Sequence, residues 1–137
     1  MTSTQAGDLD QLVAAMPFAA GLGIELDAAG PDEVRGRLAW AASRCTVGGV
    51  LHGGALMGFA DSLGGICAFL NLPPGAGTAT IESKTNLFRA VRSGVVRGVC
   101  RPLHLGRSTI VVQTDLFDDA DRRVAQVTQT QSVLPAS

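Results

Sequence analysis

The sequence predicts an α+β fold in which an antiparallel sheet packs on one long apolar helix. The first observation is an apolar stretch over residues 52–71, which begins with a glycine pair and ends before Pro73 and Pro74. The second is that the chain after Gly77 consists of strand-like segments separated by turn signals. A helix that is apolar all round needs cover on every side. We expect a curled sheet to supply most of that cover and a second subunit to supply the rest.

The N-terminal part is predicted to hold a short helix and two strands. Residues 8–16 have amphipathic spacing, with Asp8 as a plausible cap, and Pro17 interrupts them. Strands are expected over residues 23–28 and 34–42, because the Ala-Gly-Pro-Asp turn signal lies between them.

Four strands are predicted after the long helix, joined as a meander. They cover residues 78–88, 95–104, 108–117 and 122–134, with a tight hairpin at Leu105-Gly106 and a turn at residues 118–121. In the first strand, alternation places Thr80, Glu82 and Lys84 on one side. In the last strand it places five residues on one face, namely Ala125, Val127, Gln129, Gln131 and Val133.

Length, charge and composition limit the classes of function. The chain has 137 residues, 46% of them hydrophobic, which suits one domain over residues 1–137 with roughly seven flexible residues at the N-terminus. A net charge of −1, one Trp and no Tyr argue against a nucleic-acid partner. Three widely spaced cysteines form neither a disulfide framework nor a zinc pattern, so we expect a reducing, cytoplasmic compartment.

Neither a signal peptide nor a membrane span is expected. The N-terminus has no basic region followed by an apolar run. Residues 51–72 are long enough to test against the roughly 20 residues of a transmembrane helix. Asp61 lies near their centre, where a carboxylate costs about 2.5–3.5 kcal/mol on insertion scales, so a helix buried inside the protein is the better interpretation.

Candidate chemistry lies in the stretch GVLHGGALMGFADSLGG, residues 49–65. Asp61 is a single carboxylate among apolar side chains, and burying it unpaired is costly, so a chemical role is a serious interpretation. The glycine pair at Gly53 and Gly54 indicates a helix N-terminus with free N–H groups, which can stabilise a developing negative charge. A carboxylate and an oxyanion site are the minimum parts for hydrolysing an activated acyl group.

The spacing of these groups predicts a site shared by two subunits. Gly53 and Asp61 are eight residues apart, which is roughly 12 Å along one helix. One acyl carbon and its carbonyl oxygen cannot comfortably meet both groups of the same chain. We therefore expect the active site at a dimer interface.

Structural interpretations stand beside these functional ones. Asp61 could be satisfied by Ser62 or by a facing helix, His52 could bond to backbone at the helix start, and the glycine pair could permit a tight turn. Cys67 is expected to be an inert core thiol. Five arginines near strand ends could bind phosphate groups or form a solvated sheet rim; they are Arg89, Arg92, Arg97, Arg101 and Arg107.

Three segments carry a resemblance to a known family. GVLHGGALMGFADS, ESKTNLFRAVRSG and RGVCRPLHLGR, followed by the final alternating strand, resemble the hotdog-fold acyl-CoA thioesterases, and among them the phenylacetate-pathway and dihydroxynaphthoyl-CoA types. The resemblance covers residues 18–134. It implies a hotdog fold, a homodimer with a continuous sheet that often pairs into a homotetramer, and an acyl-CoA substrate.

The resemblance also implies roles for individual residues. Asp61 would be the nucleophile or general base, Gly53 would donate its N–H to the thioester oxygen, and His52 would orient the substrate. The remaining positions divide into two groups. Those expected to bind substrate are Thr46, Gly54, Gly65 and Thr80, and those expected to bind coenzyme A are Arg89, His104 and Arg107.

Some positions depart from the pattern of the relatives. Thr46 stands where relatives often have Asn or Gln, Gly65 stands where some have Thr or Ser, and Ala90 stands where Pro is common. The acid is Asp, where the dihydroxynaphthoyl-CoA branch has Glu.

The sequence as a whole predicts a thioesterase acting on an aromatic or medium-chain acyl-CoA. No cofactor is expected apart from the coenzyme A of the substrate, and no metal, because no cluster with metal-ligand spacing is seen. The acyl pocket is expected to be lined by Leu56, Met57, Phe59 and Leu63. Two alternatives stay open: a hydratase or dehydratase on the same fold, and a non-catalytic acyl-CoA binding protein.

Overall fold

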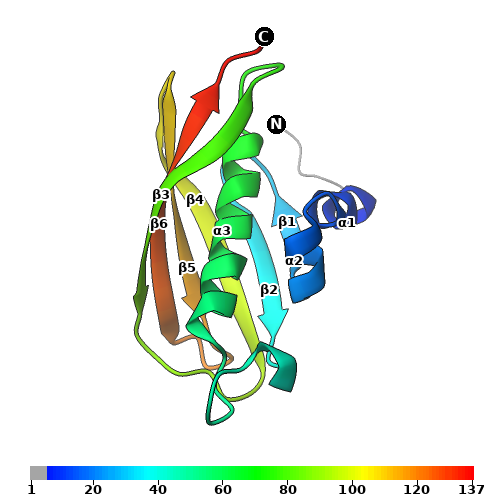
Figure 1. Cartoon of the computed structure of the whole chain (residues 1–137), viewed down its shortest axis with the longest axis vertical. Coiled ribbons are helices and arrows are strands. Elements are labelled where there is room, and N and C mark those ends of the chain that lie inside the picture. The colour runs from blue at the N-terminus through cyan, green and yellow to red at the C-terminus, as the bar shows by residue number, and fades with distance from the viewer. Residues whose placement is uncertain (1–5) are drawn as a thin grey trace.

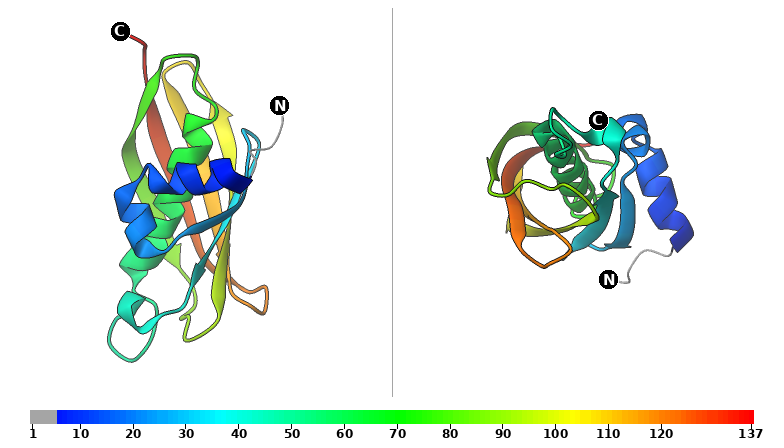
Figure 2. Two further views of the ribbon diagram at one scale, coloured as in Figure 1. Left: turned by 90° about the vertical axis from the view of Figure 1, so that its right-hand side faces the viewer. Right: turned by 90° about the horizontal axis from the view of Figure 1, so that it is seen from below.

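The chain folds as a six-stranded antiparallel sheet curled around one long helix (Figures 1 and 2). The structure is a computed structural model that describes residues 6–137. Its helices are α1 (Ala6–Ala14), α2 (Pro17–Leu22) and α3 (Gly53–Phe69), with a 3₁₀ turn η1 (Ala42–Arg44). Its strands are β1 (Glu25–Ala29), β2 (Val34–Ala39), β3 (Gly77–Leu87), β4 (Val95–Leu105), β5 (Thr109–Phe117) and β6 (Arg123–Leu134).

The predicted α+β class is confirmed, and two details of the N-terminal part are new. The predicted flexibility of the N-terminus mostly concerns residues 1–5, which lie outside the described residues, whereas α1 already begins at Ala6. Pro17 does not simply interrupt a helix but opens α2 at its first position. Proline suits that position because its fixed φ is helical and no N–H is needed there. Gly23, at a φ of 88°, ends α2.

The predicted meander is correct for β4, β5 and β6 and wrong for β3. The strand order is β1-β2-β4-β5-β6-β3, so β3 pairs with β6 at the edge of the sheet. Two hydrogen bonds hold the segment after β3 away from β4. The Phe88 N–H donates to the carbonyl of Val124 at 2.8 Å, and the Val91 carbonyl accepts from the Leu51 N–H at 2.9 Å. The chain therefore crosses the end of the sheet before β4 begins.

A bulge in β3 changes which side chains face inward. Thr80 pairs with Gln131, and Glu82 pairs with Thr130, so Ile81 is the extra residue. Residues directly opposite each other in an antiparallel pair share a face, and Gln131 is buried. Thr80 is therefore on the inner face while Glu82 and Lys84 are on the outer one, which corrects the predicted common face. The alternation predicted for β6 is confirmed.

The core forms where α3 packs on the sheet (Figure 2). Phe59 and Leu63 are both 0% exposed. Gly36 of β2 lies opposite Gly98 of β4, and a Cβ on Gly98 would stand 2.5 Å from Leu63 Cδ1. These two glycines make room for Leu63, so the expectation that Phe59 and Leu63 line an acyl pocket is wrong.

One stripe of α3 is open in the single chain, and it is the part of the helix that we expected a second subunit to cover. Met57 is 45% and Phe69 56% exposed. Gly54 and Asp61 are also exposed, and Gly65, between Asp61 and Phe69, is half-buried. These residues recur every three or four positions and so share one helix face. Among the described residues, no helix meets the length and hydropathy of a membrane span.

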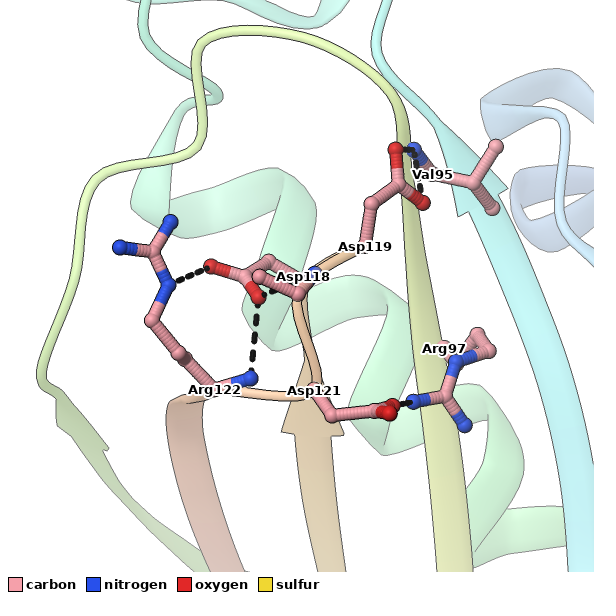
Figure 3. Close-up of polar contacts among 7 residues, drawn as sticks. Val95, Arg97, Asp118, Asp119, Asp121 and Arg122 are labelled. Atoms are coloured by element: carbon pink, nitrogen blue, oxygen red, sulfur yellow. Dashed lines mark hydrogen bonds and ion pairs between the residues drawn. The ribbon is translucent and has the colours of Figure 1, made fainter.

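The turn between β5 and β6 is organised by Asp118 (Figure 3). Its Oδ1 accepts from the backbone N–H groups of Ala120 at 2.9 Å and Arg122 at 3.0 Å, and its Oδ2 accepts from Arg122 Nε at 2.9 Å. The neighbouring Asp119 accepts from Val95 N at 3.3 Å and Asp121 pairs with Arg97, which tie the turn to β4. The backbone N–H of Arg122, with further contributions from Ala120 and the Arg122 guanidinium, holds the pKa of Asp118 below its ordinary value.

We expect Asp118→Asn to lower the thermal midpoint of unfolding by a few degrees at pH 7. Because the pKa of Asp118 is lower in the folded state, its ionised carboxylate stabilises the fold at every pH above the unfolded-state pKa of about 3.9. This stabilisation is lost as the pH falls from there through the lower pKa of the folded state. The difference from wild type should therefore shrink below about pH 4. Thermal unfolding followed by circular dichroism across pH measures it. Asp119→Asn is the control, because the hydrogen bonds of Asp119 are longer. A difference in thermal midpoint between wild type and Asp118→Asn that stays the same at every pH would contradict the prediction.

Candidate functional site

The start of α3 is held by a tight loop that ends on His52. Gly48 and Gly49 both have positive φ, 87° and 73°, a conformation that glycine adopts without strain. His52 follows in an extended conformation, with φ −61° and ψ 135°, and its N–H donates to the Arg44 carbonyl at 2.9 Å. The predicted helix start is confirmed, with His52 as the N-cap and Gly53 as the first helical residue.

The hydrogen bonds at this terminus leave one amide free. The N–H of Gly54 donates to His52 Nδ1 at 2.7 Å, and those of Ala55 and Leu56 donate to the His52 carbonyl at 2.9 and 3.2 Å. Of the four amides that begin α3, only that of Gly53 has no acceptor within residues 6–137. An unpaired N–H at the positive end of a helix is a suitable donor for an oxyanion.

His52 has a structural contact as well as an open ring edge. Its Nδ1 accepts a hydrogen bond, so the neutral ring carries its proton on Nε2. The side chain is exposed, and Nε2–H is therefore free to donate outward. The capping interpretation of His52 is confirmed, and Gly54 contributes to that cap through its N–H.

Asp61 lies two turns further along α3, on its open stripe. The carboxylate is exposed in the single chain, so the expectation that it is buried among apolar side chains is wrong. Ser62, one of the two partners considered for it, is not used, because its hydroxyl donates to the Gly58 carbonyl at 2.8 Å. Instead Asp61 Oδ1 accepts from Gln129 Nε2 of β6 at 3.0 Å.

Gln129 and Gln131 are site residues that the sequence reasoning did not single out. Both are buried, at 0% and 2% exposed. Gln131 Nε2 donates to Thr80 Oγ1 at 2.8 Å, and Gln131 Oε1 accepts from Thr78 Oγ1 at 3.3 Å. The available signal was two amides on the inner face of a strand, because a buried polar side chain needs partners.

Two cavities flank the open stripe of α3. One, of about 280 Å³, lies beside Gly53 and is lined by Val50, Leu51, Gly53, Leu56, Leu87, Phe88, Arg89 and Ala90. The other, of about 360 Å³, lies between α1, α3 and β3 and is mostly apolar. It is lined by Leu12, Ala15, Met16, Gly65, Ile66, Phe69, Thr78, Ala79, Thr80 and Gln131. The structure thus brings Gly53 together with Arg89, and Gly65 together with Thr80.

The predicted arginine cluster divides into paired and open members. Arg97 pairs with Asp121, and Arg101 pairs with Glu33. Arg89 instead lines a broad surface hollow with Phe88 and with Arg122 and Arg123, which the sequence analysis did not include. Of these two, Arg122 also pairs with Asp118 and Arg123 with Asp115. Three guanidinium groups therefore gather next to the Gly53 cavity.

His104 and Arg107 are far from Gly53 and Arg89 within one chain. They belong to the β4–β5 hairpin, which Figure 1 shows at the top of the molecule, whereas α3 begins at the bottom. Thr46 is exposed on the loop before α3, with its N–H donating to Val50 at 2.8 Å. One chain therefore does not assemble all the predicted binding residues.

Cys67 has the surroundings of an inert core thiol. It is 0% exposed. A hydrogen bond from its side chain to Cys100, together with burial, raises the pKa of Cys67, which disfavours the thiolate needed for nucleophilic attack.

Comparison with known proteins identifies the family. The model of the thioesterase superfamily matches residues 48–125. The chain is 37% identical over 86 residues, 63% of each protein, to a 1,4-dihydroxy-2-naphthoyl-CoA hydrolase of Escherichia coli, so it spans less than two thirds of that relative. It is 35% identical over 102 residues, 74% of each protein, to the proofreading thioesterase EntH of Cronobacter turicensis.

A solved structure supports the same assignment. A mutant of the thioesterase PA1618 from Pseudomonas aeruginosa superposes with a TM-score of 0.88 at 30% identity, over 96% of each chain. The expected hotdog fold and the expected family of thioester hydrolases are both confirmed at this level. The chain therefore belongs to the thioesterase superfamily.

Proposed function

We propose that this protein hydrolyses an acyl-CoA thioester to the free acid and coenzyme A. The unpaired Gly53 N–H at the start of α3, beside an apolar cavity, is the observation that carries the proposal. This amide would donate to the thioester oxygen, and the positive end of the α3 dipole would stabilise the oxyanion of the tetrahedral intermediate. Asp61 would supply the negative group that drives the attack.

Two routes are consistent with an exposed carboxylate at Asp61. It can remove a proton from a water molecule that attacks the carbonyl, or it can attack directly and form a mixed anhydride that water then hydrolyses. In both routes the C–S bond breaks and coenzyme A leaves as the thiolate. A thiolate is a good leaving group, so no strong acid is required.

The two ends of the substrate would meet different surfaces. Arg89, with Arg122 and Arg123 beside it, would bind phosphate groups of coenzyme A through charge-assisted hydrogen bonds. His104 and Arg107 would contribute to that binding only from another subunit. The largely apolar cavity beside Gly65 and Thr80 suits an aromatic or medium-chain acyl group. A hydroxynaphthoyl thioester is one member of this class, as the name of the E. coli relative suggests.

We also propose that two copies form each site, in a homodimer that can pair further into a homotetramer. Gly53 and Asp61 of one α3 lie about 12 Å apart along the helix, which is too far for one carbonyl. Strand β3 is at the sheet edge, where its outer backbone groups are free to pair, and its own residues Ile81 and Leu87 are 60% and 51% exposed. A second copy across this edge would cover the open stripe of α3 and bring the partner's helix opposite Asp61.

A mixing experiment tests the shared site. Asp61→Asn and Gly53→Pro subunits are each expected to be nearly inactive. After subunit exchange at equal amounts, half of the dimers are mixed and each has one intact site, so activity should return to about a quarter of wild type. Activity no higher than that of the two parents, despite exchange shown by mass spectrometry, would mean that each site lies within one chain.

Release of free thiol from a panel of acyl-CoAs tests the activity itself. Benzoyl, phenylacetyl, hydroxynaphthoyl and straight-chain thioesters, followed by a thiol-trapping absorbance assay, identify the acyl class. Loss of enoyl-CoA absorbance without thiol release would favour a hydratase, and tight binding without turnover would favour a non-catalytic binding protein. Coenzyme A as part of the substrate is the only cofactor in this proposal, and a cytoplasmic location is proposed with it.

A further inference from the structure

We propose that Gln129 is a positioning residue, which holds one carboxylate oxygen of Asp61 and leaves the other oxygen free to act. This inference rests on the proposed function, because it assigns Gln129 a role through Asp61. The main observation behind it is a hydrogen bond: the fully buried side-chain amide of Gln129 on β6 donates to the exposed carboxylate of Asp61 on α3.

The chemistry of the two groups fixes the orientation of the amide. An ionised carboxylate only accepts hydrogen bonds, so the Gln129 atom 3.0 Å from Asp61 Oδ1 is the NH₂ group. The amide oxygen must then point the other way. Gln129 Oε1 is buried and has no hydrogen-bond partner among the described residues.

The helix has an opening for this side chain at Gly64. A Cβ on Gly64 would stand 2.2 Å from Gln129 Oε1 and 2.5 Å from its Cδ. Any larger residue at this position would push the amide away from Asp61. Gly64 of α3 thus leaves the space that the Gln129 side chain of β6 occupies. From that space the amide contacts the Asp61 carboxylate, which lies one helical turn before Gly64.

Because Gln129 Oε1 is buried without a hydrogen-bond partner, the contact between Gln129 and Asp61 is not explained by a gain in stability. A buried acceptor without a partner is destabilising, because its hydration is lost and no hydrogen bond replaces it. An apolar side chain of similar shape removes this penalty, and Asp61, which is exposed, stays hydrated when the amide is lost. Gln131, two residues on, has a polar neighbour at each end of its amide: Nε2 donates to Thr80 Oγ1 at 2.8 Å, and Oε1 lies 3.3 Å from Thr78 Oγ1, which shares its proton with the Ser132 carbonyl at 2.7 Å. Within residues 6–137 the Gln129 amide makes one hydrogen bond, and its acceptor is Asp61.

The contact restricts a side chain that otherwise has little around it. Asp61 is exposed and has no other side-chain hydrogen bond within residues 6–137. An exposed carboxylate samples several rotamers, and a reacting group that is out of place by 1 Å loses a large part of its rate. With Oδ1 held, Oδ2 is the atom available to attack the carbonyl or to take a proton from water.

Gln129→Met tests the proposal, because it keeps the length of the side chain and removes the amide. We expect kcat for thiol release to fall by about 10- to 100-fold with KM changed less than about 3-fold. The denaturant midpoint of unfolding should equal or exceed that of wild type. Gly64→Ala is a second route to the same result from the other element, because it displaces the amide without removing it, and kcat should fall there as well.

Gln126→Met is the matched control. Gln126 lies on the same strand, faces outward, and also donates its amide to an aspartate, Asp115, at 3.1 Å. Its replacement should leave kcat unchanged. Equal falls in Gln126→Met and Gln129→Met, or a folded Gln129→Met with the kcat of wild type, would overturn the positioning role.

The Asp61→Asn background separates this inference from the proposed function. If Asp61 acts in catalysis and Gln129 acts through it, adding Gln129→Met to Asp61→Asn should not lower the residual rate further. A further fall would overturn the proposal that Gln129 works through Asp61. Full activity of Asp61→Asn alone would instead remove Asp61 from the mechanism, and the proposed chemistry with it.

Discussion

Asp61→Asn should lower kcat for thiol release by about 10²- to 10⁴-fold on the best acyl-CoA of the panel. Asparagine has the shape of aspartate but can neither accept a proton nor attack as a carboxylate. Its side-chain oxygen can still accept the hydrogen bond from Gln129 Nε2 that Asp61 Oδ1 accepts now. The loss should therefore be chemical rather than structural, and the acyl-CoA substrate should still bind.

Two measurements accompany this variant. The thermal midpoint of unfolding should stay close to that of wild type, because Asp61 is exposed and a surface substitution usually changes stability little. Binding of a non-hydrolysable acyl-CoA analogue, measured by calorimetry, should be retained. Wild-type kcat in a folded Asp61→Asn would show that another group drives the attack on the thioester.

Gly53→Pro should lower kcat by about 10²- to 10³-fold, the cost of losing one oxyanion donor. Proline has no N–H, so the substitution removes the donor that the mechanism requires and little else. The backbone is suited to it, because the first position of a helix tolerates proline. His52 already has the extended φ and ψ that a residue before proline prefers.

Gly53→Ala is the control for the added side chain. A Cβ at this position would stand 2.9 Å from Leu87 Cδ1, a flexible methyl group that both substitutions must displace. Alanine keeps the N–H, so its loss in kcat should stay below about 10-fold. Equal losses in the two variants would attribute the effect to the contact with Leu87 rather than to the amide.

Local signals predicted the elements with little error. The start of α3 was predicted to within one residue, because a cap followed by apolar periodicity is a short-range pattern. The turn at residues 118–121 was also predicted correctly, because Asp118, which organises it, bonds to backbone N–H groups of the turn itself. The inner face of β6 follows from alternation alone, and all five of its predicted residues lie on that face.

Signals that depend on distant residues were the ones missed. The bulge at Ile81 is defined by its pairing with β6, so alternation within β3 placed Thr80 on the wrong side. The position of β3 at the sheet edge depends on which strand completes its hydrogen bonds, and a local pattern of alternation does not specify that.

The helix α2 was missed for a local reason instead, because its six residues are too few to show helical periodicity.

Local sequence is sufficient to show that a long helix begins at His52, and that Asp61 lies two turns into it with a glycine amide at its start. These features depend on neighbouring residues and on the fixed rise of a helix. The exposure of Asp61 and its hydrogen bond with Gln129 depend instead on the packing of distant elements. That contact joins residues 68 positions apart, and it forms because the packing of α3 on the sheet brings Gly64 over β6. Which side chains reach a site is set by packing across elements, whereas where an element begins is set by its own residues.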